Sequence, residues 1–193
     1  MSYAGTCATL RAPLMAEEMK GGRADASVRL ARGRAAYSRG DLSKAAGELN
    51  AAFEGFSSAG DSLGMGRTLL HLAVVALDRG DLDGGAASAG RGVEVLQGAD
   101  DVEATLCGLE VVARVAGAAG DPWSAVRLLA AAERHRSGAK PPDCSPVATS
   151  ELADHSRAEL GVEAFEHEWA AGSALSRAQA VALALARCGV APA

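Results

Sequence analysis

The sequence contains no isoleucine, and only 4% of its residues are aromatic. Because β-strands depend on β-branched and aromatic side chains, few residue types remain from which a sheet could be built. Alanine, leucine, arginine and glutamate are abundant, and all four favour helices. The composition therefore predicts an all-α protein, and a chain of 193 residues with 49% hydrophobic content is long enough to bury a sizeable core.

Other signals are missing as well. The net charge of -5 lacks the basic excess of nucleic-acid-binding proteins, so we expect no direct nucleic-acid partner. No apolar run approaches the roughly 20 residues that a transmembrane helix needs. The first 22 residues carry charged side chains and no apolar core of a secretory signal. These absences predict a cytoplasmic protein without a membrane partner.

Motifs for catalysis and metal binding are also absent. Glu166-His167-Glu168 lacks the second histidine of a zinc-protease helix. Neither a GxSxG nucleophile turn nor a GxxxxGK[ST] phosphate loop occurs. We therefore expect no enzyme activity, no catalytic residue, no metal and no cofactor. The cysteines have no CxxC spacing and are expected to be free thiols in a reducing compartment, with Cys107 buried and inert; they are Cys7, Cys107, Cys144 and Cys188.

A Gly-Asp pair recurs every 40 residues. The pairs are Gly40-Asp41, Gly80-Asp81 and Gly120-Asp121. Glycine fits the left-handed position just past a helix, and aspartate fits the N-cap of the helix that follows. Pro122 agrees with a helix start, since proline is tolerated in the first turn. Each pair therefore predicts the corner of a helical hairpin, and Arg79-Gly80-Asp81 is such a corner, not a cell-adhesion signal.

Three hairpins are predicted over residues 24–138, at about 24–61, 62–101 and 102–138. Stretches 58–61 and 98–101 are interpreted as linkers between them. The first helices of the second and third hairpins carry apolar stripes with i, i+3, i+4, i+7 spacing, which we expect to face the core. The two stripes are Leu69, Leu72, Ala73 and Ala76, followed by Leu109, Val112, Ala113 and Ala116.

The remaining segments lie at the two ends. Residues 1–23 are expected to be flexible, with a short helix that stops at Gly21-Gly22. Residues 139–146 form a proline-containing linker, and residues 147–189 a cap of three short helices. Gly161 separates the first two, and Ser176 with Gln179 forms a capping box for the third. We expect Phe165 and Trp169 to anchor the cap on the third hairpin, and Trp123 to pack at the start of its own helix.

The pattern of small residues and Gly-Asp turns resembles the tetratricopeptide repeat over about residues 24–137. Gly33, Ala73 and Ala113 occupy matching positions in the first helices. The 40-residue period departs from the family's usual repeat of about 34 residues. From about residue 55 to 187, including GDSLGMGRTLLHLAVVALDRGDLDGG, the chain is similar to the C-terminal helical region of bacterial LuxR-type and cyclase-linked signalling ATPase regulators.

The resemblance implies a tetratricopeptide-like solenoid of about three hairpins with a helical cap. It implies protein or peptide binding in a bacterial signalling or transcriptional regulatory assembly, with small-molecule effector sensing and self-association into a homo-oligomer as alternatives. In this register the first helices form a concave surface that includes Ser27 and Leu30. Its arginines would bind the carboxylates of an acidic amphipathic peptide. The candidate partner-binding residues are Arg34, Tyr37, Arg67, Leu70, Val74 and Arg114.

A second interpretation of the same surface remains open. Neighbouring helices would then cover the apolar positions, and the arginines would pair with carboxylates of the chain itself.

Overall fold

The computed structural model describes residues 6–137 and 147–190, with side chains from residue 21 onward, and all regular secondary structure in these ranges is helical. The prediction of an all-α fold is therefore confirmed. The helices are α1 (Thr6–Ser38), α2 (Leu42–Ser58), α3 (Ser62–Asp78), α4 (Leu82–Gly98), α5 (Val102–Ala118), α6 (Pro122–His135), α7 (Thr149–Leu160), α8 (Val162–Ser173) and α9 (Arg177–Arg187).

Five corners of one design connect α1 to α6. At each corner a residue with positive φ precedes an aspartate, whose side chain accepts a hydrogen bond from the backbone N–H three residues later. The aspartates thus cap the helices that follow them. The positive-φ residues are Gly40, Gly60, Gly80, Asp100 and Gly120.

The corners fall at 20-residue intervals, so the 40-residue repeat contains two similar halves. The stretches 58–61 and 98–101 connect successive hairpins as predicted, but they are not a separate kind of linker, because Gly60-Asp61 and Asp100-Asp101 form the same corner as the other Gly-Asp pairs. Asp100, with φ of 53°, is the one non-glycine with positive φ in the described part of the chain. The chain thus reverses direction after each of the helices α1 to α5.

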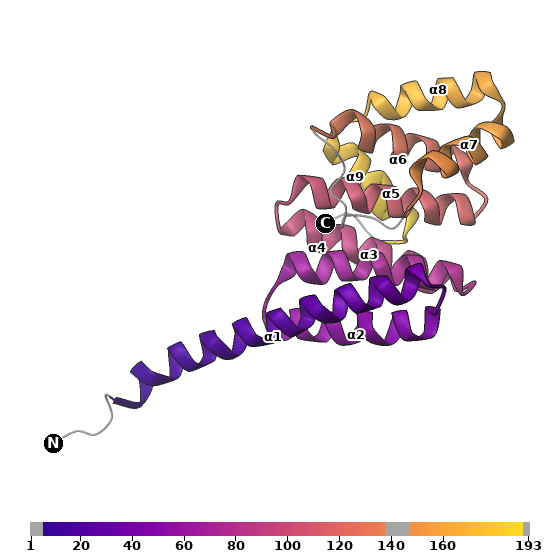
Figure 1. Ribbon diagram of the computed structural model, residues 1–193. Helices are drawn as coiled ribbons and strands as arrows, with labels where there is room; N and C mark the ends of the chain where they lie inside the picture. Colours follow the sequence, from indigo (N-terminus) through magenta and orange to yellow (C-terminus); the bar gives the residue numbers. More distant parts are fainter. Residues whose placement is uncertain (1–5, 138–146, 191–193) are drawn as a thin grey trace.

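Consecutive helices pack side by side to form a repeated hairpin arrangement. The pairs α1–α2, α3–α4 and α5–α6 stack in chain order, and α1, α3 and α5 contact one another in turn (Figure 1). One large core runs from α3 to α9, and its fully buried members include Leu70, Val93, Leu109 and Leu128. Two smaller clusters join α1, α2 and α3, around Leu49 and Phe56. The hydrophobic core is therefore larger in the C-terminal part of the stack than around α1 and α2.

The three predicted C-terminal helices are confirmed as α7, α8 and α9. Gly161, with φ of 79°, separates α7 from α8, and Ser176 and Gln179 form the predicted capping box at the start of α9. α7 and α8 both contact α6, whereas α9 contacts α4, α5 and α6 and crosses behind α5 and α6 in Figure 1. The third of these helices thus covers one side of the stack.

At the other end, the predicted helix stop at Gly21-Gly22 is wrong. α1 continues through both glycines and extends well beyond α2 (Figure 1). An added Cβ at either glycine would meet no other part of the protein within 4 Å. The predicted linker 139–146 lies outside the described residues.

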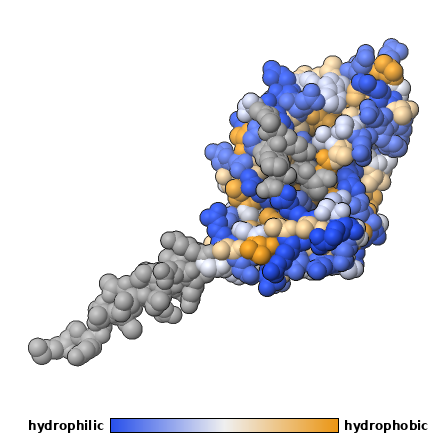
Figure 2. Space-filling model, viewed as in Figure 1, coloured by the Kyte–Doolittle hydropathy of each residue, from blue (hydrophilic) through white to orange (hydrophobic). Residues whose placement is uncertain are grey.

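The surface is mostly polar on the face drawn in Figure 2, where hydrophobic side chains form small separate patches. Among the described helices, none combines the length and the hydropathy needed to cross a bilayer.

Candidate functional site

A pocket between α1 and α3 contains four residues of the predicted concave surface. Its volume is about 270 Å³. Ser27, Leu30 and Arg34 line it from α1, and Arg67 lines it from α3. The structure therefore brings two of the three candidate arginines together. The remaining lining residues are Arg23, Ala31, Phe56, Asp61, Leu63 and Gly64.

Positive charge dominates this pocket, which we call the α1–α3 pocket. Arg23 Nε lies 2.6 Å from Asp61 Oδ2, while Asp61 Oδ1 accepts the backbone N–H of Gly64 at the start of α3. Arg67 Nη2 lies 3.8 Å from Asp101 Oδ2, too far for a hydrogen bond. Three arginines thus surround one carboxylate within the pocket.

Sequence reasoning missed Arg23 and Asp61. The Gly60-Asp61 pair was visible in the sequence, but it was interpreted as part of a linker. Recognition of its 20-residue spacing from Gly40-Asp41 would have placed Asp61 at a helix start beside α1. Arg23 lies at the point where a helix stop was expected, so its contact with α3 could not be anticipated.

The apolar candidates occupy a different environment. Leu70 and Val74, which follow Leu30 and Arg34 by 40 residues, are fully buried in the core. The expectation that they form a floor open to a partner is corrected, because α5 and the residues around it cover them. The concave surface is thus open between α1 and α3 and filled between α3 and α5.

Tyr37 and Arg114 belong to a network that connects three helices. The hydroxyl of Tyr37 donates to Asp78 Oδ2 at 2.7 Å, and Arg114 binds both Asp78 and Tyr37. Burial, together with the hydrogen bond to Asp78, raises the pKa of Tyr37. Burial alone would lower the pKa of Arg114, but the contacts with Tyr37 and Asp78 outweigh it and raise that pKa. The second interpretation, pairing within the chain, therefore describes Arg114.

Two further pockets meet at Trp169, which stacks on Phe165 with 5.4 Å between ring centroids. One, of about 280 Å³, contains Glu110 and Arg136; the other, of about 270 Å³, contains Arg157. Arg136 Nη2 donates to Glu110 Oε1 at 2.8 Å, and its Nη1 donates to Glu103 Oε2 at 2.9 Å. An aromatic wall and charged groups of both signs thus meet between α5, α7 and α8.

Trp123 does not form a comparable site. Its side chain is 47% exposed, so the expectation that it packs at the start of α6 is only partly met.

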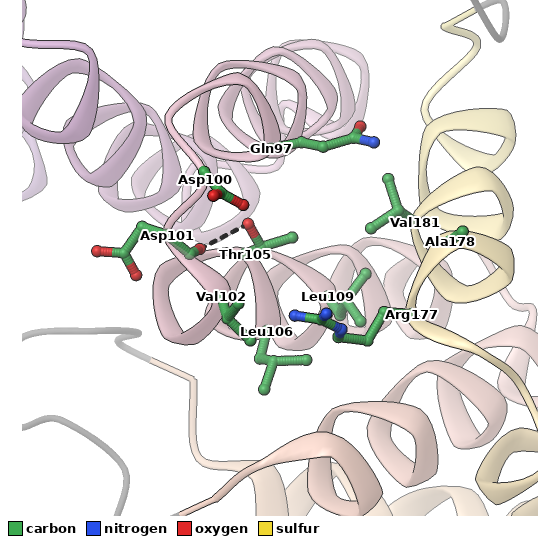
Figure 3. A pocket seen from close by; sticks show the side chains of 10 residues that line it. All are labelled: Gln97, Asp100, Asp101, Val102, Thr105, Leu106, Leu109, Arg177, Ala178 and Val181. Carbon is green, nitrogen blue, oxygen red and sulfur yellow. Dashed lines mark hydrogen bonds between the residues drawn. The ribbon is translucent and has the colours of Figure 1, made fainter.

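A smaller pocket of about 200 Å³ lies where α9 begins (Figure 3). Asp100 and Asp101 line it at the α4–α5 corner, where the Asp101 carboxylate points away from the pocket, and Arg177 lines it from α9. Thr105 donates a hydrogen bond to the carbonyl oxygen of Asp101, which helps to hold the corner. Leu106, Leu109 and Val181 add apolar surface, so the pocket has charged walls above an apolar floor.

The cysteines differ from the expectation of free thiols. Cys107 is fully buried and disulfide-bonded, so that expectation was wrong at this position. Cys188 is a free thiol, and burial raises its pKa to about 11. A thiol of that pKa is protonated and poorly nucleophilic at neutral pH. Within the described part of the chain, no cluster of side chains suited to a metal ion was found.

Comparisons of the chain with protein-family models, with curated proteins and with solved structures found no match.

Proposed function

We propose that the protein is a non-catalytic, tetratricopeptide-like helical solenoid that binds a protein or peptide partner in a bacterial regulatory assembly. The observation that carries the proposal is the α1–α3 pocket, in which Arg23, Arg34 and Arg67 lie between two stacked helices. Arginine suits such a role because its planar group makes paired hydrogen bonds to a carboxylate. The partner segment is therefore expected to be acidic.

The shape of the pocket favours an amphipathic segment. Leu30, Phe56 and Leu63 provide apolar surface next to the arginines. A ligand with a carboxylate on one side and an aliphatic side chain on the other would satisfy both kinds of surface. The 3.8 Å separation of Arg67 from Asp101 leaves the guanidinium donors able to bind a partner carboxylate.

The test measures binding of defined peptides to the full chain by fluorescence anisotropy. An acidic amphipathic peptide is compared with a version in which each acidic residue is replaced by lysine. The Arg34→Glu/Arg67→Glu double variant should weaken the acidic peptide by about a hundredfold or more, since each lost charged contact contributes over 1.4 kcal/mol. Arg114 is not substituted in this test, because reversing its charge would disrupt the contacts with Tyr37 and Asp78.

Arg32→Glu is the matched control, because Arg32 is exposed on α1 and does not line the pocket. Arg32→Glu changes the net charge by the same amount as a single Arg→Glu substitution in the pocket. It should leave the affinity for the acidic peptide nearly unchanged. Equal affinities for the acidic and basic peptides would exclude this function for the pocket. Equal losses of affinity in Arg32→Glu and in the single variants Arg34→Glu and Arg67→Glu would exclude it as well.

A second candidate function is the sensing of a small-molecule effector between the stack and its cap. The pair of pockets at Trp169 favours it, because an aromatic face, Arg136 and Glu110 are brought together there. Trp169 provides the probe: addition of an effector should change its fluorescence and raise Tm. Compounds that raise the Tm of the native chain and of a Trp169→Ala variant equally would count against this location.

A further inference from the structure

A groove that no described residue fills runs between α2 and α4. It has a volume of about 460 Å³, with α3 as its floor. Ala46 and Asn50 line it from α2, and Gly84 and Ser88 line it from α4. We call it the α2–α4 groove. The other lining residues are Leu72, Val75, Ala76, Arg79 and Asp81.

The chain contains a second groove of the same construction, 40 residues later. It lies between α4 and α6 with α5 as its floor, and α9 occupies it, in contact with all three helices. The residues that α9 contacts match the lining of the α2–α4 groove. Gly90, the equivalent of Asn50, lies against Cys188. Asp121, the equivalent of Asp81, pairs with Arg187, with 2.7 Å between Oδ2 and Nη1.

The floor residues of the two grooves differ in burial, because α9 covers the α4–α6 groove and no described helix covers the α2–α4 groove. Val112 and Ala116 of α5 are buried in one core cluster with Ala180, Val181, Ala184 and Leu185 of α9. The equivalent residues of α3, Leu72 and Ala76, are only half-buried. Leu72 and Ala76 thus keep a partial solvent exposure that their equivalents under α9 lose, while Val75 is buried like its equivalent Val115.

We propose that the α2–α4 groove binds an amphipathic helix of a partner protein, in the position that α9 occupies in the α4–α6 groove. Helix-in-groove recognition needs an apolar floor and spacing wide enough for one helix, and the filled groove demonstrates both for this repeat. This site is separate from the α1–α3 pocket, and the proposal does not depend on the function of that pocket.

The lining residues argue against α9 of a second copy as the occupant. A Cβ atom at Gly90 would lie 2.6 Å from Cβ of Cys188 and 2.9 Å from Val190. Asn50 has that Cβ and a larger side chain, so α9 in the same position would overlap it. The partner helix instead needs a glycine opposite Asn50, because alanine would keep the Cβ atom that overlaps.

Charge gives a second requirement for the partner helix. Arg79 is exposed and forms no ion pair with a described side chain, whereas its equivalent in the filled groove is the neutral Ala119. Asp81 Oδ1 caps α4, which leaves a second oxygen for a cation, as Asp121 uses its own for Arg187. The partner helix is therefore expected to carry an acidic residue near Arg79 and a basic residue near Asp81 at its C-terminal end.

The experiment uses a displayed peptide library on the sequence of residues 176–190, with positions 186–190 randomised and the full chain as bait. Peptides should be recovered that have a glycine at position 188 and an acidic residue among the randomised positions. Their affinities are then measured by fluorescence anisotropy for the native chain and for three variants.

Ser88→Trp fills the groove, and its matched control is Ala87→Trp, because Ala87 is exposed on α4 outside the groove. We expect Ser88→Trp to weaken binding about tenfold or more and Ala87→Trp to change it less than about twofold, as for contacts inside and outside an interface centre. Arg79→Glu, an exposed change that leaves the fold intact, should weaken the acidic peptides about tenfold. The Arg34→Glu/Arg67→Glu variant should bind them as the native chain does.

Three outcomes would overturn the proposal. The first is failure to recover any peptide. The second is recovery of peptides that bind Ser88→Trp and Arg79→Glu as well as they bind the native chain, because such peptides bind elsewhere. Recovery of the native Arg187-Cys188 sequence, with a dimer in sedimentation that Ser88→Trp abolishes, would identify a second copy as the occupant.

Discussion

The two halves of the helical stack use one repeat unit but present different surfaces. From α1 to α4, both the α1–α3 pocket and the α2–α4 groove are open. From α3 to α9, the equivalent spaces are filled by Leu70 and Val74 between α3 and α5 and by α9 between α4 and α6. The repeat therefore determines where grooves form, and the residues added to it determine which grooves stay open. Substitutions at matched positions in the two halves test this difference.

The largest effect is expected where α8 approaches α6. A Cβ on Gly172 would overlap the carbonyl oxygen of Arg127 and lie 2.6 Å from its Cα, so backbone would have to move. We expect Gly172→Ala to lower the free energy of unfolding by about 3 kcal/mol, as in severe overpacking. Urea unfolding would measure the change.

The matched substitution is Gly47→Ala, in the interior of α2, where nothing lies within 4 Å of an added Cβ. It should stabilise the protein by about 0.5–1 kcal/mol because alanine is the better helix former. Equal effects of the two substitutions would contradict the contrast in packing between the halves.

The next largest effect is expected in the α4–α6 groove, where α9 packs. Gly90→Leu should push Cys188 and Val190 away from α4 and cost about 2 kcal/mol. Hydrogen exchange of the α9 amides should accelerate more than that of the α2 amides. Asn50→Leu, at the equivalent position of the open groove, should change stability by less than about 0.5 kcal/mol. A cost as large at position 50 would mean that the groove is not open.

A smaller effect is expected from the ion pair between Arg127 and Glu168. The buried Glu168 carboxylate binds Arg127 and His167, and these contacts, chiefly that with Arg127, lower its pKa below the ordinary 4.5. Its stabilisation is therefore complete above pH 4.5 and is lost as the pH falls through the lower folded-state pKa. Glu168→Gln should cost about 1.5 kcal/mol at neutral pH and flatten the acid limb of a stability-versus-pH curve.

Asp25→Asn is the control for this prediction in the first half. The pair Arg29–Asp25 is largely solvent-exposed, so its loss should be barely measurable. A stability curve whose acid limb is the same in the Glu168→Gln variant and in the native chain would show that the buried pair does not contribute as described.

The smallest effect is expected at the corner that differs from the others. Asp100 adopts a φ of 53°, which glycine tolerates better. Asp100→Gly should therefore stabilise the protein by roughly 0.5–1 kcal/mol, and Gly80→Asp should destabilise it by a similar amount. Thermal unfolding would measure both. Changes of the same sign would mean that the corners are not equivalent.

Local signals in the sequence were enough to predict the helices and most of their ends. Gly-Asp corners, the Ser176 capping box and the break at Gly161 act within a few residues, so each can be recognised without knowledge of the fold. The Asp100-Asp101 corner was missed because an aspartate occupies the glycine position. The stop predicted at Gly21-Gly22 failed because glycine lowers helix propensity without forbidding a helix.

The site was harder to predict because it depends on contacts between distant segments. Whether Leu70 faces a groove or the core depends on which helix packs over it. The 40-residue period does not reveal which helix that is. Arg114 binds Asp78 and Tyr37 across three helices, and the sequence gives no spacing rule for such a network. Arg34 and Arg67 were placed in one pocket correctly because their register follows directly from the repeat.

The regular corners also restrict how the length of this protein can change. Helices α2 to α5 each contain 17 residues. Deleting one residue inside any of them would rotate everything that follows by about 100° around that helix axis. Gain or loss of two consecutive helices would instead preserve both the direction of the chain and the faces it presents. Variation in length should therefore occur in steps of a whole hairpin, and each added hairpin would create another groove of the kind that α9 fills.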